Sequence, residues 1–412
     1  MLQEGIFYQQ GSTPGKHWGL LFIRVKSDAN AEEIYKALNP LWSILQKLKT
    51  GAINDLPTIT LPTPPSGLQV TIGYGKNIFA RTGIKKKLPG EITQANFRPP
   101  LATGGGKVLL ASGLSYAETI TKNPATEDIA LQFISDSELL TYRCYMESYK
   151  FIAGEKDNEL FPFELVKFYS GFQREDRRSW IDFHDGISNL KSGDERLDAI
   201  RIKENNTEGE QWTIGGTFLA FMRIEVNIDT WIKLDRITQE LLVGRDKLSG
   251  CPLENIVNNR PVTVSKCPFA GTASIIDQAS NGEYPNKDFF ETPKTSDALV
   301  LTSHVQRANH HREPISHRDS LRIFRQGYEF FEVSDNNPKV KIGLNFVSFQ
   351  DTPERLIRIL TQDTWLGGVN FGGSDNNQTI DNSILKIWGA GIYILPPAND
   401  MNKIPGYELF EG

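Results

Sequence analysis

The sequence has few cysteines, and their pattern excludes two kinds of cofactor site. Cys144, Cys251 and Cys267 are its three cysteines. No C-x-x-C or C-x-x-C-H motif occurs, which excludes thiolate zinc sites and covalently attached c-type haem. An odd number of cysteines also gives no fully paired disulfide framework. We therefore expect all three to be reduced thiols in a cytosolic protein.

Long apolar runs and an excess of basic residues are absent as well. No run approaches the roughly 18 apolar residues of a membrane-spanning helix. The first residues, MLQEGIFYQQG, have neither the basic nor the apolar region of a secretory signal. We expect a cytoplasmic protein with no membrane partner. The net charge of -5 argues against nucleic acid as a partner, because phosphate neutralisation requires a basic surface.

The glycine-rich segments do not match a phosphate-binding loop. In ATGGGKVLL, Leu101 stands where the first Walker glycine belongs, and Val108 replaces the serine or threonine. In GYGKNIFARTG, Ile78 occupies the third glycine position of G-x-G-x-x-G. Neither G-x-S-x-G nor H-E-x-x-H occurs. These absences leave the histidines and the pattern of secondary structure as the informative features.

Hydrophobic patterning predicts the same order of elements twice. Strand-like runs are followed by helical patterns after the first and third strand of each half, which gives two β-α-β-β-α-β units. We predict an α+β protein of duplicated ferredoxin-like modules, each an antiparallel sheet with helices packed on it. The expected strands cover residues 19–25, 68–75, 129–135 and 163–169, then 217–226, 321–331, 341–350 and 384–395.

The predicted helices include SDANAEEIYKALNPLWSILQKL and SDSELLTYRCYMESYKFI in the first half. In the second half they are DTWIKLDRITQELLVG and DTPERLIRILTQDTWL. We expect an N-terminal module at 1–175, a connecting segment at 176–211 and a C-terminal module at 212–412.

Four of the six histidines lie in LTSHVQRANHHREPISHR, residues 301–318. Their spacing does not suit a shared metal site, because helical ligands lie four residues apart and His304 and His310 are six apart. His304 alone follows an apolar run, whereas the other three, His310, His311 and His317, lie among polar residues. A histidine at the edge of an apolar segment is usually a core residue. Its functional alternative is a single axial ligand to haem iron.

Three other segments contain residues that could accompany such a ligand. Asp185 precedes a glycine in WIDFHDGISN and is by default a simple turn carboxylate. Arg325 lies inside an apolar strand, where an unpaired guanidinium would be costly. Leu344 and Phe346 are two residues apart, so they share one face of a strand. Each feature alone is weak.

In this order, however, the segments resemble the dye-decolourising (DyP-type) haem peroxidases. The resemblance covers most of the chain and includes LQVTIGYGKNIFARTGI, SWIDFHDGISN, SHVQRANHHRE, RIFRQG and GLNFVSFQDTPERLIRIL. It implies a duplicated ferredoxin-like fold with one non-covalent haem b in the C-terminal module. It also implies a peroxidase that reduces hydrogen peroxide and oxidises dyes and phenolic or other aromatic reductants. The oligomeric state stays open.

The resemblance assigns roles position by position. His304 becomes the iron ligand, Asp185 the distal carboxylate in the connecting segment, and Arg325 the distal arginine. Leu344 and Phe346 become walls of the distal pocket, and Asn309 a further haem-binding residue. The chain departs from the family's G-x-x-D-G motif at Asp182, which replaces the first glycine, so the turn must accommodate a side chain there.

Two alternatives stay open at this point. His184, next to Asp185, could be the acid–base group, although adjacent residues in an extended turn point apart. The chain could also be a haem-handling protein with little turnover, but such a protein needs only His304. The presence of Asp185 and Arg325 favours the peroxidase.

Overall fold

The computed structural model describes residues 1–9, 12–53, 56–60, 67–87, 115–116, 127–190, 192–204, 210–269, 292–308, 322–333, 340–360, 384–400 and 402–411. The first half has the predicted element order, formed by β1 (His17–Val25), α1 (Ala31–Leu48), β4 (Gln69–Tyr74), β6 (Ile129–Ser135), α3 (Glu138–Gly154) and β7 (Phe163–Phe172). A capping box starts α1. The side chain of Asn30 accepts from the Glu33 amide, and the Glu33 carboxylate accepts from the Asn30 amide.

The second half repeats this order with an interrupted first helix. Its elements are β8 (Thr217–Val226), α5 (Ile228–Trp231), α6 (Arg236–Val243), β11 (Phe324–Val333), β12 (Val340–Gln350), α9 (Glu354–Leu360) and β13 (Leu385–Leu395). The single helix predicted from Asp229 to Gly244 is therefore wrong. Asp235 caps a new helix by accepting from the Thr238 amide at 2.7 Å, so the chain turns between α5 and α6 although the apolar periodicity continues.

The strands of both halves form one sheet in the order β4-β6-β1-β7-β11-β12-β8-β13, with β5 (Ser115–Tyr116) beyond β13. Within each half the last strand pairs with the first, the first with the third, and the third with the second, all antiparallel. This is the strand order of a ferredoxin-like module, so the predicted α+β fold of duplicated ferredoxin-like units is confirmed.

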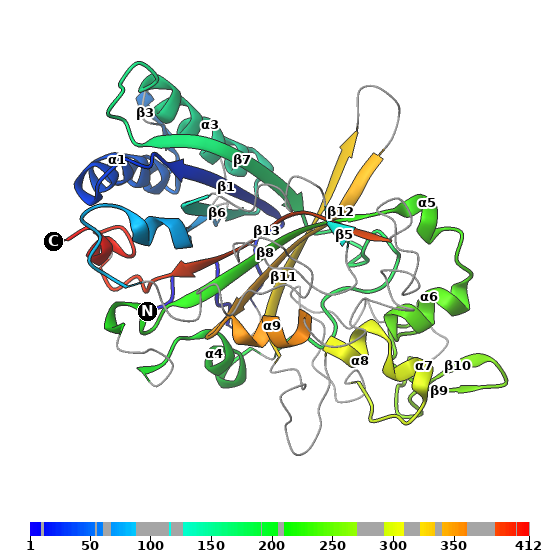
Figure 1. Cartoon of the computed structure of the whole chain (residues 1–412). Coiled ribbons are helices and arrows are strands. Elements are labelled where there is room, and N and C mark those ends of the chain that lie inside the picture. Colours follow the sequence, from blue (N-terminus) through cyan, green and yellow to red (C-terminus); the bar gives the residue numbers. More distant parts are fainter. Residues whose placement is uncertain are drawn as a thin grey trace.

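Two short junctions join the modules into a closed ring. Glu329 of β11 pairs with Phe172 of β7, and Ile394 of β13 pairs with Tyr74 of β4. Each junction is a single residue pair, and together they close the eight strands into a barrel. Figure 1 shows α1 and α3 against the strands of the first module, while α6, α8 and α9 lie near the strands of the second.

Alternate residues of β1 face two different apolar cores. Along β1, Leu21, Ile23 and Val25 belong to the core beneath the helices. Trp18, Leu20 and Phe22 face the barrel interior, where they meet residues of the second module. The rings of Trp18 and Tyr328 stack with their centroids 5.6 Å apart. The barrel interior is therefore built jointly by both modules.

The remaining strands and α-helices of the described residues lie outside the eight-stranded ring. They are β2 (Ala52–Ile53), β3 (Leu56–Thr60), α4 (Asp194–Ile200), the hairpin β9 (Leu253–Val257) and β10 (Arg260–Thr263), α7 (Ala298–Leu301) and α8 (His304–Ala308). Among the helices in the described part of the chain, none has the length and apolarity needed to cross a bilayer.

The expectation of three reduced thiols is wrong for two of them. Cys251 and Cys267 form a disulfide with their Cα atoms 6.1 Å apart, whereas Cys144 is free and buried. An odd number of cysteines permits one bridge and one thiol. The sequence shows no pairing here because the bridge depends on how the β9–β10 hairpin returns to the start of β9.

Candidate active site

A cavity of about 250 Å³ lies between the outer face of the second module's strands and the helices that cover it. Residues of β8, β11, β12 and β13 line one side. Helices α6, α8 and α9 and the connecting segment at 179–189 line the others. Five of the predicted site residues meet in this cavity, namely Asp185, His304, Arg325, Leu344 and Phe346. The sixth, Asn309, lies outside the described residues, as do His310, His311 and His317.

Strand β11 supplies one wall by alternation. Arg325, Gly327 and Glu329 line the cavity, while Phe324 and Tyr328 belong to the barrel interior. In the antiparallel register, Gly327 lies opposite Phe346 and Glu329 opposite Leu344. The same alternation therefore brings the two apolar residues of β12 onto the face that carries Arg325.

Arg325 is joined to the connecting segment through its backbone. The Asn189 side-chain amide donates to the Arg325 carbonyl at 2.8 Å, and the Asn189 side-chain oxygen accepts from the Arg325 amide at 3.1 Å. This reciprocal pair fixes the segment that carries Asp185 against β11 at the position of the arginine.

Asp185 lies over the glycine of β11. The Asp185 amide donates to the Arg177 carbonyl at 3.0 Å, and its Oδ1 accepts from the Gly186 amide at 2.7 Å. Its Oδ2 would be 3.2 Å from a Cβ atom built on Gly327. The absence of a side chain at 327 is therefore what allows the carboxylate to approach the strand.

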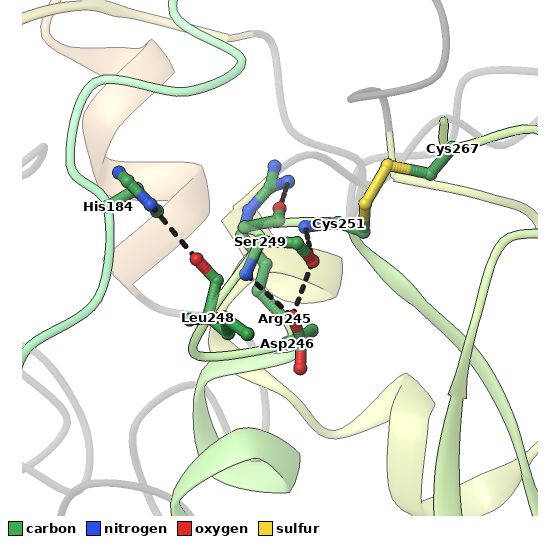
Figure 2. Close-up of a disulfide and its surroundings, with 8 residues drawn as sticks. His184, Arg245, Asp246, Leu248, Ser249, Cys251 and Cys267 are labelled. Carbon is green, nitrogen blue, oxygen red and sulfur yellow. Dashed lines mark hydrogen bonds between the residues drawn. A yellow bond between two sulfur atoms is a disulfide. The ribbon is translucent and has the colours of Figure 1, made fainter. Parts of the chain in front are cut away.

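His184 makes a different contact from its neighbour. Its Nε2–H donates to the Leu248 carbonyl at 3.2 Å, on the loop that follows α6 (Figure 2). Burial, with a smaller contribution from the Arg178 charge, lowers the pKa of His184 to about 4. The ring is therefore neutral at ordinary pH and hydrogen-bonded away from Asp185.

His304 begins helix α8, just after the short helix α7. Burial lowers the pKa of His304 to about 3, and the positive charges of Arg325 and Arg245 act in the same direction. The imidazole is therefore neutral, which is the form that ligates a metal. Within the described residues, no cluster of three or more histidine, cysteine or acidic side chains could bind a metal ion.

The position of α8 depends on close packing against the end of α6. Gly244 ends α6 with φ +89°, a left-handed conformation that favours glycine. A Cβ atom there would lie 2.3 Å from Ser303 Oγ and 2.6 Å from Val305 Cγ2. These two residues flank His304, so Gly244 permits the contact that places the histidine.

The family model described as Dyp-type peroxidase, C-terminal, matches residues 176–400. The chain belongs to the DyP-type peroxidase family. The matched region contains every residue described above as lining the cavity.

The relatives compared with this chain are distant in sequence. Deferrochelatase of Escherichia coli (strain K12) is 23% identical over 406 residues, covering 94% of this chain and 81% of the relative. Ferric DtpA from Streptomyces lividans superposes with a TM-score of 0.67 at 19% identity, covering 100% of this chain and 95% of the other. A DypB variant from Rhodococcus jostii RHA1, in complex with heme, gives 0.59 at 13% identity and 96% coverage of both chains. At these identities the structural likeness establishes the fold alone.

The departure from the DyP-type motif at Asp182 is accommodated locally. Asp182 has φ 67°, a conformation that aspartate tolerates better than most side chains. Its amide donates to the Ser179 carbonyl at 2.8 Å, and its carboxylate pairs with Lys247 Nζ at 3.3 Å. The turn therefore keeps a left-handed residue without the glycine.

Three charged residues of the cavity, Arg245, Arg322 and Glu329, were missed by sequence reasoning. Burial, together with the charge of Arg325, lowers the pKa of Arg245 to about 9, and its guanidinium donates to Ser188 Oγ at 2.8 Å. The only signal for Arg245 was its place directly after the helix-ending Gly244. Glu329 had a weaker one, an acidic residue within the strand-like run GYEFF.

The disulfide and His184 lie on opposite sides of the loop that follows α6 (Figure 2). Figure 2 shows Cys251 and Cys267 beside the turn of Arg245, Asp246 and Ser249. The Cys251 carbonyl accepts from the Asp246 amide at 2.9 Å. Ile187, two residues after Asp185, packs in one buried cluster with both cysteines and Val264. The bridge therefore supports the segment that carries the carboxylate.

Proposed function

We propose that this chain is a haem-dependent peroxidase in which His304 ligates the iron, while Asp185 and Arg325 activate hydrogen peroxide. Its membership of the DyP-type family makes it an oxidoreductase with peroxide and a reductant as substrates. One observation supports the residue assignments above all. A neutral histidine, a carboxylate and an arginine from three separate segments line one cavity with two bulky apolar residues.

The residues of the cavity suit a haem. Met222, Ile224, Leu356, Ile359 and Leu385 give an apolar lining for a flat macrocycle. His304 offers one uncharged imidazole, and the haem complex of the DypB relative supports the same cofactor here. With Cys251 and Cys267 bridged and Cys144 buried, we expect one haem b per chain, bound without thioether bonds. When bound, the haem supplies a redox-active iron to which peroxide can coordinate.

Asp185 is assigned the proton transfer. Its carboxylate takes a proton from one peroxide oxygen and returns it to the other, so that water leaves instead of hydroxide. Arg325 provides a fixed positive charge that stabilises the negative charge developing on the leaving oxygen. Leu344 and Phe346 exclude bulk water and large molecules from the space between them.

Aromatic reductants are expected to react at the edge of the cavity. A bound haem would fill most of this cavity, and Leu344 and Phe346 would narrow the space left beside Asp185 and Arg325. Dyes and phenolic compounds are therefore expected to give up their electrons from outside, while hydrogen peroxide enters.

The assignment of His304 is tested by haem retention. His304→Ala should lose most of its haem during gel filtration, because the cavity then lacks its nitrogen ligand, whereas His310→Ala and His317→Ala should keep it. The measurement is the ratio of Soret to protein absorbance after reconstitution with equal haem. Equal loss in all three variants would contradict a single ligand.

A haem-handling protein with little turnover is the second candidate, favoured by the similarity to Deferrochelatase. Stopped-flow reaction with peroxide separates the two functions. In a peroxidase, Arg325→Leu slows this reaction by about 10²–10³-fold, since one preorganised charge is lost. A haem-handling protein would react slowly already in the wild type, and the variant would change little.

A further inference from the structure

A second carboxyl group, that of Glu329, lines the same cavity as Asp185. Glu329 is 6% exposed, and within the described residues its Oε2 has no hydrogen-bond partner. It lies on β11 four residues after Arg325 and faces the same side. Its backbone pairs with Phe172 at the junction of the two modules, which fixes the position of the strand there.

Gly327 lies between Arg325 and Glu329 on the cavity face of β11 and leaves room for the Asp185 carboxylate. A Cβ atom at this position would lie 3.2 Å from Asp185 Oδ2 and 3.1 Å from Leu344 Cδ1. Glu329 follows Gly327 by two residues on the same face of β11, opposite Leu344. No side chain at 327 therefore separates Asp185 from Glu329, and a water molecule can bridge the two groups.

The surroundings of Glu329 favour its neutral form. Burial, with smaller contributions from the charges of Asp185 and Asp176, raises the pKa of Glu329 to about 9. Arg174 and the Trp180 amide lower it by smaller amounts. The Arg174 guanidinium is hydrogen-bonded to Asp176, because its Nε and Nη2 donate to that carboxylate at 3.0 and 2.5 Å. Arg325 is the other charged side chain of β11 that lines the cavity.

We propose that Glu329 holds the proton that Asp185 uses in successive turnovers and passes it to that carboxylate through water. The proposal deepens the peroxidase function proposed above and rests on it. Reduction of one hydrogen peroxide to two waters consumes two electrons from the reductant and two protons from the medium. Asp185 returns to the second oxygen the proton that it takes from the first, so these two protons are needed afterwards, when the electrons arrive. In the step assigned here, the O–H bond of Glu329 breaks and an O–H bond forms on Asp185. The Glu329 carboxylate then recovers a proton from solvent.

The first test does not require activity. Infrared spectra of the haem-free protein at neutral pH should contain the carbonyl band of a buried carboxylic acid that disappears only in alkaline solution. The band should be missing in Glu329→Gln. It should persist in Glu332→Gln, a matched change on the same strand of an exposed carboxylate that pairs with Arg223. If Glu329→Gln keeps the band, Glu329 is not the proton-holding group and the proposal is overturned.

The second test compares single and multiple turnovers of the haem-loaded protein. Glu329→Gln should form the first oxidised state at the wild-type rate, because Asp185 is intact. Its steady-state rate should fall by about tenfold, less than the roughly 10²–10⁴-fold effect of a direct acid–base group. Glu329→Asp should keep part of the wild-type steady-state rate. A high concentration of a small weak acid should raise the steady-state rate of Glu329→Gln towards the wild-type rate. An unchanged steady-state rate in Glu329→Gln would overturn the proposal.

Failure of the peroxidase function would look different. A wild-type protein that binds haem but does not react with peroxide contradicts the function and with it the relay. If the wild type reacts normally with peroxide and the steady-state rate of Glu329→Gln equals the wild-type rate, only the proposed proton transfer from Glu329 is contradicted.

Discussion

His184 and Asp185 are adjacent, yet their side chains have different surroundings. His184 donates to the Leu248 carbonyl, whereas Asp185 Oδ2 approaches the position of a Cβ on Gly327. We therefore predict that Asp185→Asn lowers kcat/KM for peroxide by roughly 10²–10⁴-fold, as expected for loss of a general acid–base group. His184→Gln keeps a side-chain amide that can donate to Leu248 and should stay within a few-fold of wild type. Steady-state peroxide kinetics check the ranking, and the reverse order would assign the role to His184.

Activity in acid does not decide between these two residues. A histidine with an ordinary pKa near 6.5 would be protonated and unable to act as a base at pH 5. Because burial lowers the pKa of His184 to about 4, its imidazole also remains unprotonated there. Good activity at acidic pH is thus expected with either residue, and only the variants distinguish them.

The same shift predicts a loss of stability in acid. The unfolded chain protonates His184 below about pH 6.5, while the folded chain resists until about pH 4. The unfolded state therefore binds more protons in this window, and stability falls as the pH falls. In urea unfolding of the haem-free protein, His184→Gln should remove a slope on the order of 1 kcal/mol per pH unit. An identical pH dependence in wild type and variant would show that His184 is not buried in its neutral form.

The sequence indicated a functional role for some residues of the site but not for others. Asp185, His304 and Arg325 lie in segments that resemble a family motif, so their roles could be proposed before their positions were known. The resemblance assigned no role to Glu329 or to Arg245, although the segment that contains Arg245 also resembles the family. Their importance depends on facing the cavity while buried, which is a property of the folded sheet and of the α6–β9 loop.

At the scale of elements, strands were easier to predict than helix ends. The predicted strands at 129–135 and 217–226 coincide with β6 and β8, because alternating or continuous apolar runs end at polar residues. The break between α5 and α6 was missed, since one hydrogen bond from the Thr238 amide to the Asp235 side chain outweighs an uninterrupted apolar pattern. The short helices α7 and α8 have too few residues to show a periodicity.

The disulfide ties the loop after α6 to the end of the β9–β10 hairpin. Cys251 and Cys267 are separated by 16 residues, a loop whose closure stabilises a protein by roughly 3 kcal/mol in the chain-entropy account. We predict that the Cys251→Ser, Cys267→Ser double variant unfolds at lower urea concentration than wild type. Because Ile187 packs on the bridge, its peroxide reactivity should also fall.

Reductant provides the control for this prediction. Wild type treated with dithiothreitol should match the double variant, which itself should not respond to reductant. Cys144 is present in both proteins, so its chemistry cancels in the comparison. If reductant leaves the unfolding of wild type unchanged, the bridge does not stabilise this part of the fold.

At the scale of the whole molecule, the two modules form one structure. The sequence predicted two units because each has its own element order. Ring closure was not predictable, since the Glu329–Phe172 and Ile394–Tyr74 pairs join segments far apart in the chain. The interior that results is shared, for Trp18 of the first module stacks with Phe221 and Tyr328 of the second.

A shared interior predicts that damage to the first module reaches the haem site. Leu38 is fully buried on α1, in the core between the helices and the first module's strands, and does not line the cavity. Leu38→Ala should cost about 2–5 kcal/mol, and because the barrel unfolds as a unit, haem release and loss of helix signal should shift together to lower urea. Leu139→Ala, at a residue 55% exposed on α3, should change neither. If circular dichroism shifts while the Soret transition stays at its wild-type midpoint, the modules unfold independently and the barrel does not couple them.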